Sequence, residues 1–199
     1  MLETRPGVYF WQARHPEWVP DDGWDELVSS YALDDGERLV VIDPLAPPPE
    51  LQELASKRET AIVLTCQWHR RDAEQLAGRL GAPLYAPAPN PEDSDEPVDG
   101  NRYGPGDRLP AELEALRGLD ETDIVLWSPR HAAVIAGDTL LDRGEGLVLP
   151  GDWAAKRPGG AEAVRQSLAP LLRREVDVVL PTHGLPTDRD ALERALTQP

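Results

Sequence analysis

The stretch that decides the fold lies in the first half of the chain and reads Ile62-Val63-Leu64-Thr65-Cys66-Gln67-Trp68-His69-Arg70-Arg71-Asp72. An apolar run at residues 61–64 predicts a short buried strand. Leucines at helical spacing follow within residues 72–80, and Gly81 is a suitable helix stop. A strand therefore ends, several polar side chains follow, and a helix begins. Because ligand crevices in α/β sheets lie at the carboxyl ends of strands, we expect a functional site here.

Length and charge limit the class of protein. The chain has 199 residues, 40% of them hydrophobic, and we expect a single domain over residues 1–199. There are 36 acidic and 20 basic residues, which gives a formal net charge of −16. This charge argues against a nucleic-acid partner and against an anionic membrane surface. Its simplest role is to keep the protein in solution.

Cysteine content and apolar runs bear on location. The chain has one cysteine, which cannot form an intramolecular disulfide, and this favours a cytoplasmic protein. The first six residues contain no apolar stretch typical of a signal peptide. Nowhere does the sequence hold about 18 consecutive apolar residues, so we expect no membrane span.

Apolar patterning divides the chain into short strands and amphipathic helices. Asp34-Asp35-Gly36 predicts a hairpin turn, and Pro44 should end the strand that follows it. An acidic loop at residues 90–100 should be exposed, and Pro170 should break a helix. We expect strands at residues 7–14, 27–33, 38–42, 61–64, 83–86, 103–109, 112–117, 123–127, 131–136 and 176–180, and helices at residues 51–58, 72–80, 161–174 and 188–197.

Polar side chains stand at the ends of four predicted strands. Asp43 follows a nearly all-aliphatic strand, Asp138 follows another, and His183 comes after the last strand. Because strand ends that share one edge of a sheet lie close together, we expect these side chains to meet in one crevice. The fourth strand end is the opening stretch, with Cys66, Trp68 and His69.

Three of these strand ends carry short motifs that point to one family. They are Val-Ile-Asp-Pro at residues 41–44, Ala-Gly-Asp-Thr-Leu at residues 136–140 and Leu-Pro-Thr-His-Gly-Leu-Pro at residues 180–186. In order and spacing, the chain from residue 7 to residue 196 resembles the metallo-β-lactamase superfamily. The resemblance implies an α+β fold, a four-layer αβ/βα sandwich. Two mixed sheets would face each other, helices would cover the outside, and the site would lie at one edge between the sheets.

The resemblance also predicts an incomplete metal site. The family carries His-x-His-x-Asp-His directly after a strand that ends in threonine, here Thr65. Aligned on that threonine, the four ligand positions hold Cys66, Trp68, Arg70 and Arg71. A shift by one residue places His69 on the second histidine but restores no other ligand. Leu119 stands where the family has a further histidine, and arginines near the centre would repel a divalent cation. We therefore expect no dinuclear site.

Two classes of function remain open. The first is a metal-free relative, with no cofactor, that binds a small molecule or a protein partner in the old crevice. That crevice would be formed by Asp43, Trp68, His69, Arg70 and Arg71. The second is a hydrolase of an ester, thioester or lactone that uses one zinc, manganese or iron ion. Its metal ligands would be Cys66, Asp138 and His183.

We favour the metal-free class because four ligand positions of the family are altered together. Whether the protein is an enzyme stays open, as do the substrate and the oligomeric state. Asp138 and His183 are the candidates for a catalytic role, although Asp138 also suits a turn and Cys66 also suits a small buried hydrophobe. A basic partner should lower the pKa of Asp138. The candidate partners are His183, Arg70 and Arg71.

Overall fold

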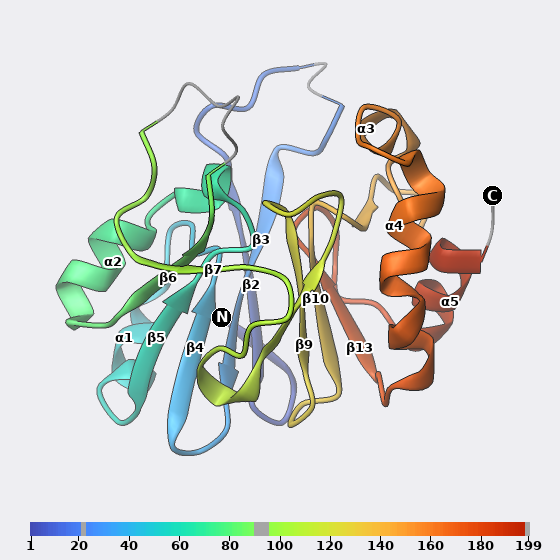
Figure 1. The fold of residues 1–199 in the computed structure, drawn as a ribbon. Coiled ribbons are helices and arrows are strands. Elements are labelled where there is room, and N and C mark those ends of the chain that lie inside the picture. Colours follow the sequence, from blue (N-terminus) through green and yellow to red (C-terminus); the bar gives the residue numbers. More distant parts are fainter. Residues whose placement is uncertain (21–22, 90–95, 198–199) are drawn as a thin grey trace.

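A seven-stranded sheet forms one half of the molecule (Figure 1). The computed structural model describes residues 1–20, 23–89 and 96–197. The strand order follows the chain from β1 to β7, antiparallel up to β4 and parallel from β4 onward. The strands are β1 (Leu2–Arg5), β2 (Val8–Arg14), β3 (Leu27–Asp34), β4 (Arg38–Ile42), β5 (Glu59–Val63), β6 (Leu84–Pro87) and β7 (Asn101–Tyr103).

A four-stranded sheet faces the first one, with the order β13-β10-β9-β8. Its β13 runs parallel to β10, and the remaining pairs are antiparallel. A separate hairpin pairs β11 (Leu141–Asp142) with β12 (Leu147–Val148). The four strands of the sheet are β8 (Glu114–Arg117), β9 (Ile124–Ser128), β10 (Ala133–Gly137) and β13 (Val178–Pro181).

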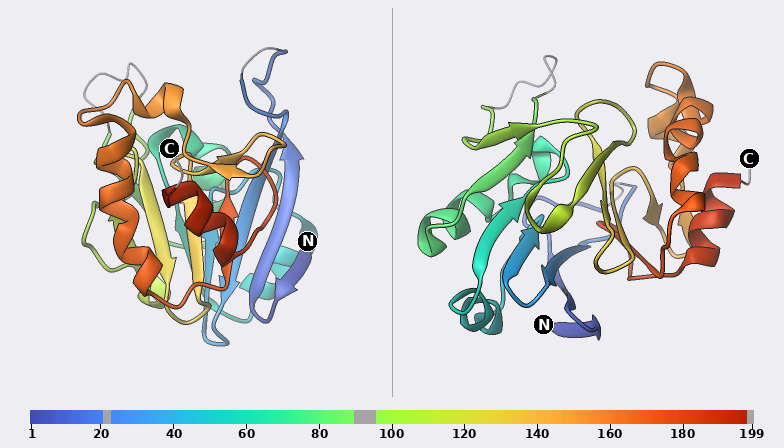
Figure 2. Two further views of the ribbon diagram at one scale, coloured as in Figure 1. Left: turned by 90° about the vertical axis from the view of Figure 1, so that its right-hand side faces the viewer. Right: turned by 60° about the horizontal axis from the view of Figure 1, so that its bottom comes forward.

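Helices cover the outer face of each sheet (Figures 1 and 2). The larger sheet carries α1 (Pro49–Ala55) and α2 (Ala73–Leu80), and the smaller sheet carries α3 (Gly151–Ala154), α4 (Gly160–Leu168) and α5 (Arg189–Thr197). The break expected at Pro170 is present, because α4 stops at Leu168 and a 3₁₀ turn follows. The 3₁₀ turns of the described chain are Gln67–Arg70, Pro110–Glu112 and Ala169–Arg173.

Three apolar clusters separate the layers. The first lies between the sheets and joins Leu33, Ile42, Val63, Ile124, Leu126 and Ile135. The second and third lie under the helices of the smaller and the larger sheet. Each fully buried aliphatic side chain stabilises the fold by about 1.5–3 kcal/mol. The order helix, sheet, sheet, helix is the four-layer sandwich that the sequence predicted, and that prediction is confirmed.

Several element boundaries differ from the expected ones. Residues 2–5 form an edge strand that the sequence pattern did not predict, and β7 ends at Tyr103 because a Gly-Pro-Gly turn follows. Residues 90–95 of the acidic loop lie outside the described residues. Val98 is buried rather than exposed, since it joins the cluster under α2 and its N–H donates to Gln67 Oε1.

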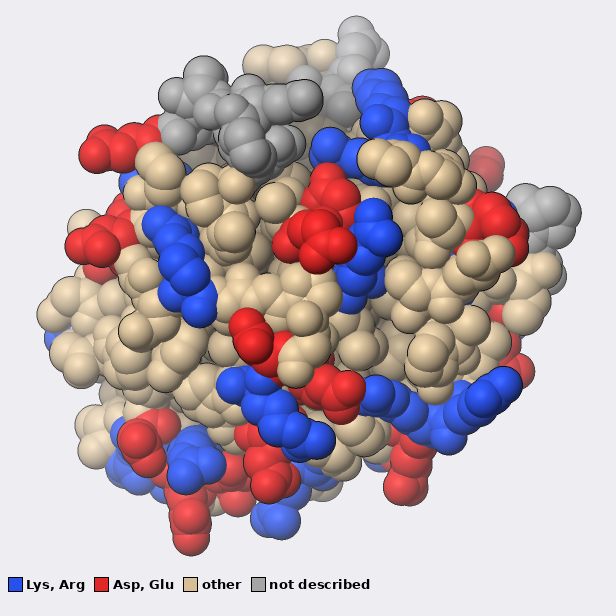
Figure 3. All heavy atoms as spheres, in the orientation of Figure 1, with Lys and Arg blue, Asp and Glu red and all other residues tan. Residues whose placement is uncertain are grey.

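Charged side chains of both signs are interspersed over the face seen in Figure 3, without a broad patch of either sign. No helix among the described residues is long and apolar enough to cross a membrane.

Candidate functional site

Two pairs of parallel strands place the four predicted strand ends together. β4 and β5 are neighbours in the larger sheet, and they are followed by Asp43 and Thr65. β10 and β13 are neighbours in the smaller sheet, and they are followed by Asp138 and His183. The sheets approach closely here, because a side chain at Gly137 would begin 3.2 Å from Cβ of Thr65. Gly137 also has a positive φ of 54°, which suits glycine.

Asp43 is anchored on the end of β5. Its Oδ1 accepts from the backbone N–H of Thr65 at 2.9 Å, and its Oδ2 accepts from the Thr65 hydroxyl at 2.6 Å. Its φ of 47° is a left-handed conformation that aspartate tolerates better than most residues. The residue is only 1% exposed, so these bonds are needed to offset the desolvation of its carboxylate.

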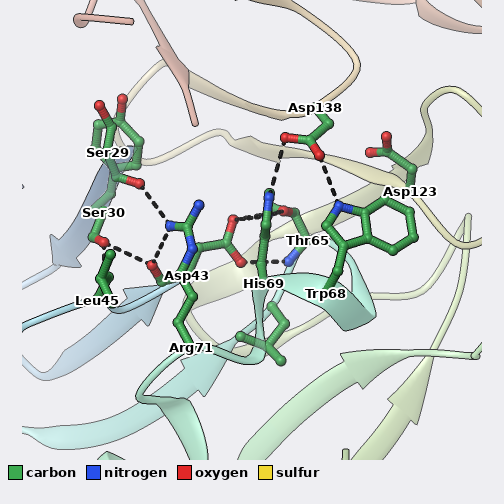
Figure 4. Close-up of polar contacts among 12 residues, drawn as sticks. Ser29, Ser30, Asp43, Leu45, Thr65, Trp68, His69, Arg71, Asp123 and Asp138 are labelled. Carbon is green, nitrogen blue, oxygen red and sulfur yellow. Dashed lines mark hydrogen bonds and ion pairs between the residues drawn. The ribbon is translucent and has the colours of Figure 1, made fainter. Parts of the chain in front are cut away.

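His69 lies between two carboxylates (Figure 4). Its Nδ1 is 3.1 Å from Oδ2 of Asp43 and 3.0 Å from the hydroxyl oxygen of Thr65, and its Nε2 is 3.2 Å from Oδ1 of Asp138. Burial lowers the pKa of His69, but the charges of Asp138 and Asp43 outweigh burial and raise that pKa to about 9. His69 is therefore an imidazolium at neutral pH in this arrangement.

Asp138 is almost fully enclosed by aromatic and histidine side chains. Its Oδ2 accepts the indole N–H of Trp68 at 2.8 Å. Its Oδ1 lies 3.2 Å from Nε2 of His69 and 3.4 Å from Nε2 of His183, but no described donor is aligned for a hydrogen bond to it. Burial raises the pKa of Asp138, yet His69 and His183 together hold it well below its usual range.

The two arginines of the motif do not pair with Asp138, and that expectation was wrong. Arg70 points toward the outside and pairs with Glu74 at 2.7 Å. Arg71 donates from Nη1 to the carbonyl oxygens of Asp43 and Ser29, at 3.0 and 3.3 Å. Of the three expected partners only His183 lies beside Asp138, and His69 takes the place expected for an arginine.

Two further residues at this site were not among the site residues predicted from the sequence. Trp24 lies with its ring centroid 5.0 Å from that of His183, whose Nδ1 has no hydrogen-bond partner among the described residues. Asp123 is fully buried behind Asp138, and its Oδ1 accepts from the Thr139 hydroxyl at 3.2 Å. Burial and then the charge of Asp138 raise the pKa of Asp123 well above its usual value.

Only one group of side chains in the described residues is spaced to hold a metal ion. Sγ of Cys66, a ring nitrogen of His69 and a carboxylate oxygen of Asp138 all lie within 4.8 Å of one another. The sequence-based set contained His183 in place of His69. Burial raises the pKa of the Cys66 thiol well above its usual value, and the charge of Asp138 adds to this. The donor set of one thiol, one imidazole and one carboxylate fits a single ion.

An open hollow of about 350 Å³ adjoins this cluster. It is bordered by the partly exposed ring of Trp68 and by the two arginines of the motif. Its other walls include His15, Leu45 and Asp72. Trp68, whose indole N–H donates to Asp138, lies between the hollow and the buried cluster.

The sequence model described as the metallo-beta-lactamase superfamily matches residues 61–183. This is more than half of the chain, and the chain belongs to that superfamily. Among curated proteins, no sequence matches it significantly.

Solved structures support the same assignment of the fold. DIM-1 metallo-beta-lactamase exposed to ceftazidime is 18% identical with a TM-score of 0.70, covering 98% of this chain and 94% of that one. The metallo-beta-lactamase family protein TTHA1429 from Thermus thermophilus is 17% identical with a TM-score of 0.64, covering 96% and 77%. TTHA1623, solved in a di-iron-bound form, is 26% identical with a TM-score of 0.60, covering 84% and 93%.

Proposed function

We propose that this protein is a metal-free member of the metallo-β-lactamase superfamily that binds a small molecule in the hollow beside His69. The observation that carries the proposal is the position of His69. Its ring stands between Asp43 and Asp138, with one nitrogen 3.1 Å and the other 3.2 Å from a carboxylate oxygen. The imidazolium of His69 supplies one positive charge between the two buried carboxylates, and the guanidinium of Arg71 interacts electrostatically with both and supplies a second.

Side chains at the altered ligand positions support the same interpretation. Trp68 donates its indole N–H to Asp138, and Arg71 donates to the carbonyl oxygen of Asp43. The indole ring and the guanidinium thus fill space at two of the positions where the family resemblance calls for metal ligands. Hydrogen bonds to charged groups are each worth about 1.5–3 kcal/mol, so these two bonds support a cluster that is stable without an ion.

The size of the hollow favours a small molecule over a protein partner. Its volume of about 350 Å³ lies at the lower end of the range for small-molecule sites. Trp68 is 38% exposed and offers a ring face, while Leu45 adds an apolar wall. Arg71 and His15 supply positive or hydrogen-bonding groups on the same rim. A compact ligand with an apolar body and one polar or anionic group matches these walls.

Zinc titration tests the metal-free part of the proposal. Micromolar zinc should leave the melting temperature of the wild-type protein unchanged, and metal analysis after purification without chelator should find no stoichiometric ion. A metal bound only to the folded state would instead raise the melting temperature by mass action. Such a rise, lost in His69→Gln and Asp138→Asn but kept in the control His131→Gln, would overturn the proposal.

Ligand-observed NMR with a library of small organic molecules tests the binding part. Compounds that bind the hollow should lose their signal changes with Trp68→Ala and keep them with Trp153→Ala, since Trp153 lies on α3 beside Arg143. A library without binders, or binding that is indifferent to Trp68, would contradict a ligand site in this hollow.

A hydrolase with one metal ion is the second candidate, and the grouping of Cys66, His69 and Asp138 favours it. A zinc, manganese or iron ion held there would act as a Lewis acid on an ester, thioester or lactone. Asp43 would orient His69 through Nδ1, which is the usual support for a ligating imidazole. Activity that is abolished by a chelator and restored by one of these ions would establish this candidate.

A further inference from the structure

A second hollow lies on the flank formed by α4, α5 and the β11–β12 hairpin, which face the viewer on the left of Figure 2. Its volume is about 300 Å³. Arg165 in the last turn of α4 and Arg194 in the last turn of α5 both border it. Leu147 and Leu149 provide apolar walls, and Glu145 stands on the rim. None of these residues belongs to the cluster around His69.

Neither arginine forms an ion pair or a side-chain hydrogen bond within the described part of the chain. This is unusual on this flank, because Arg174 pairs with Glu114 through two bonds of 2.8 Å and Arg189 pairs with Glu193 at 2.8 Å. Nε of Arg165 is withdrawn from solvent without an acceptor. A buried donor left without an acceptor costs free energy, which an incoming acceptor would offset.

We propose that this hollow binds the carboxylate group of a small organic acid. Two arginine residues border one hollow, and the planar guanidinium group of arginine matches the geometry of a carboxylate. The volume admits only a small molecule, and the leucine walls suit a short aliphatic chain. The carboxylate would face Arg165 and Arg194, and the chain would lie against Leu147 and Leu149.

Charge selects a carboxylate over a phosphate. Glu145 on the rim repels a second negative charge, and the whole chain carries a formal net charge of −16. A monoanion gains the two guanidinium contacts with less of this repulsion than a dianion. Both helix ends also favour positive charge, which explains why the arginines are tolerated there without a carboxylate of the protein.

Thermal denaturation with sodium butyrate, compared with sodium chloride at equal ionic strength, tests the proposal. At tenfold excess over the dissociation constant, butyrate should raise the melting temperature by about 3–6 °C. Arg165→Gln and Arg194→Gln should each lose most of this rise. The matched control Arg79→Gln, which removes an exposed arginine from the last turn of α2, should keep it.

Phosphate and the rim residue separate the two anion classes. The wild-type protein should have a lower affinity for inorganic phosphate than for butyrate. In Glu145→Gln the gap between the two affinities should be smaller, because the rim residue no longer repels the second negative charge. No rise with butyrate, or a rise that survives in both arginine variants, would overturn the proposal and leave the arginines as helix-end charges. Tighter binding of phosphate than of butyrate would overturn the carboxylate assignment. None of these readouts depends on metal or ligand binding at His69.

Discussion

The pH dependence of stability provides the sharpest test of the role of His69. Burial lowers the pKa of His69, but Asp138 and Asp43 raise it from 6.5 to about 9 in the folded protein. Because the folded state binds this proton more tightly, the stabilisation is fully present below pH 6.5 and is lost as the pH rises through 9. The difference between the two pKa values corresponds to about 3 kcal/mol of unfolding free energy.

Urea unfolding followed by tryptophan fluorescence measures this contribution. Between about pH 6 and about pH 8.5, the wild-type protein should lose about 2 kcal/mol more unfolding free energy than His69→Gln, which has no proton to lose. Comparing the two proteins at each pH removes the contributions of other titrating groups that they share. His69 is only 3% exposed, so solvent screening reduces the effect little.

Parallel profiles of unfolding free energy against pH for wild type and His69→Gln would refute the reasoning. They would show that the pKa of His69 is not higher in the folded state than in the unfolded state. Nitrogen-15 NMR of the imidazole gives an independent check. The ring signals assigned to His69 should be those of an imidazolium at about pH 8, well above the usual pKa of histidine.

Three further substitutions probe the side chains around His69. Asp138→Asn should lower the free energy of unfolding by about 1–3 kcal/mol at neutral pH. The pKa of Asp138 is depressed in the folded protein, so the stability difference between wild type and Asp138→Asn should shrink as the pH falls below 3.8. Acid titration of the wild-type protein and of the variant measures this difference. Thr65→Val should cost about 1–3 kcal/mol in urea unfolding, because Asp43 loses its 2.6 Å hydroxyl donor. The raised pKa of Asp123 means that its carboxyl group ionises more readily in the unfolded chain than in the folded protein, which costs stability as the pH rises above 3.8. Asp123→Asn should therefore be more stable than the wild-type protein above this pH. The same dependence of unfolding free energy on pH in both proteins would contradict this.

The edge of the fold where the site lies could be predicted from local features. Pro44 cannot extend a ladder, so it fixed the end of β4 and left Asp43 at the strand tip. Aliphatic runs marked β5, β10 and β13, and polar residues directly after them marked their ends. These features depend only on neighbours in the sequence, which is why the positions of Asp138 and His183 followed from them.

The contacts of His69 could not be predicted in the same way. They depend on the 3₁₀ turn Gln67–Arg70 and on a positive φ of 36° at Arg71, which together turn the ring inward and the Arg70 side chain outward. No periodicity in the sequence specifies such a turn. The ring contact of Trp24 with His183 joins residues far apart in the chain, so it too depends on tertiary packing.

The total charge of the cluster does not distinguish the metal-free binding protein from the metal-dependent hydrolase. The number of protons released when zinc is added does. A divalent ion at Cys66, His69 and Asp138 would replace the imidazolium proton of His69 and the thiol proton of Cys66, so the total charge of the cluster would stay the same. The pKa of His69 is about 9 and that of the thiol is raised well above its usual value, so both protons are present at neutral pH. Metal binding would then release two protons, and the apparent zinc affinity would rise about 100-fold per pH unit below pH 9. Calorimetric titration of zinc in buffers of different ionisation enthalpy counts these protons. Release of two protons would support the hydrolase candidate, whereas no binding heat and no released protons across this range are expected if His69 itself is the cation of the site.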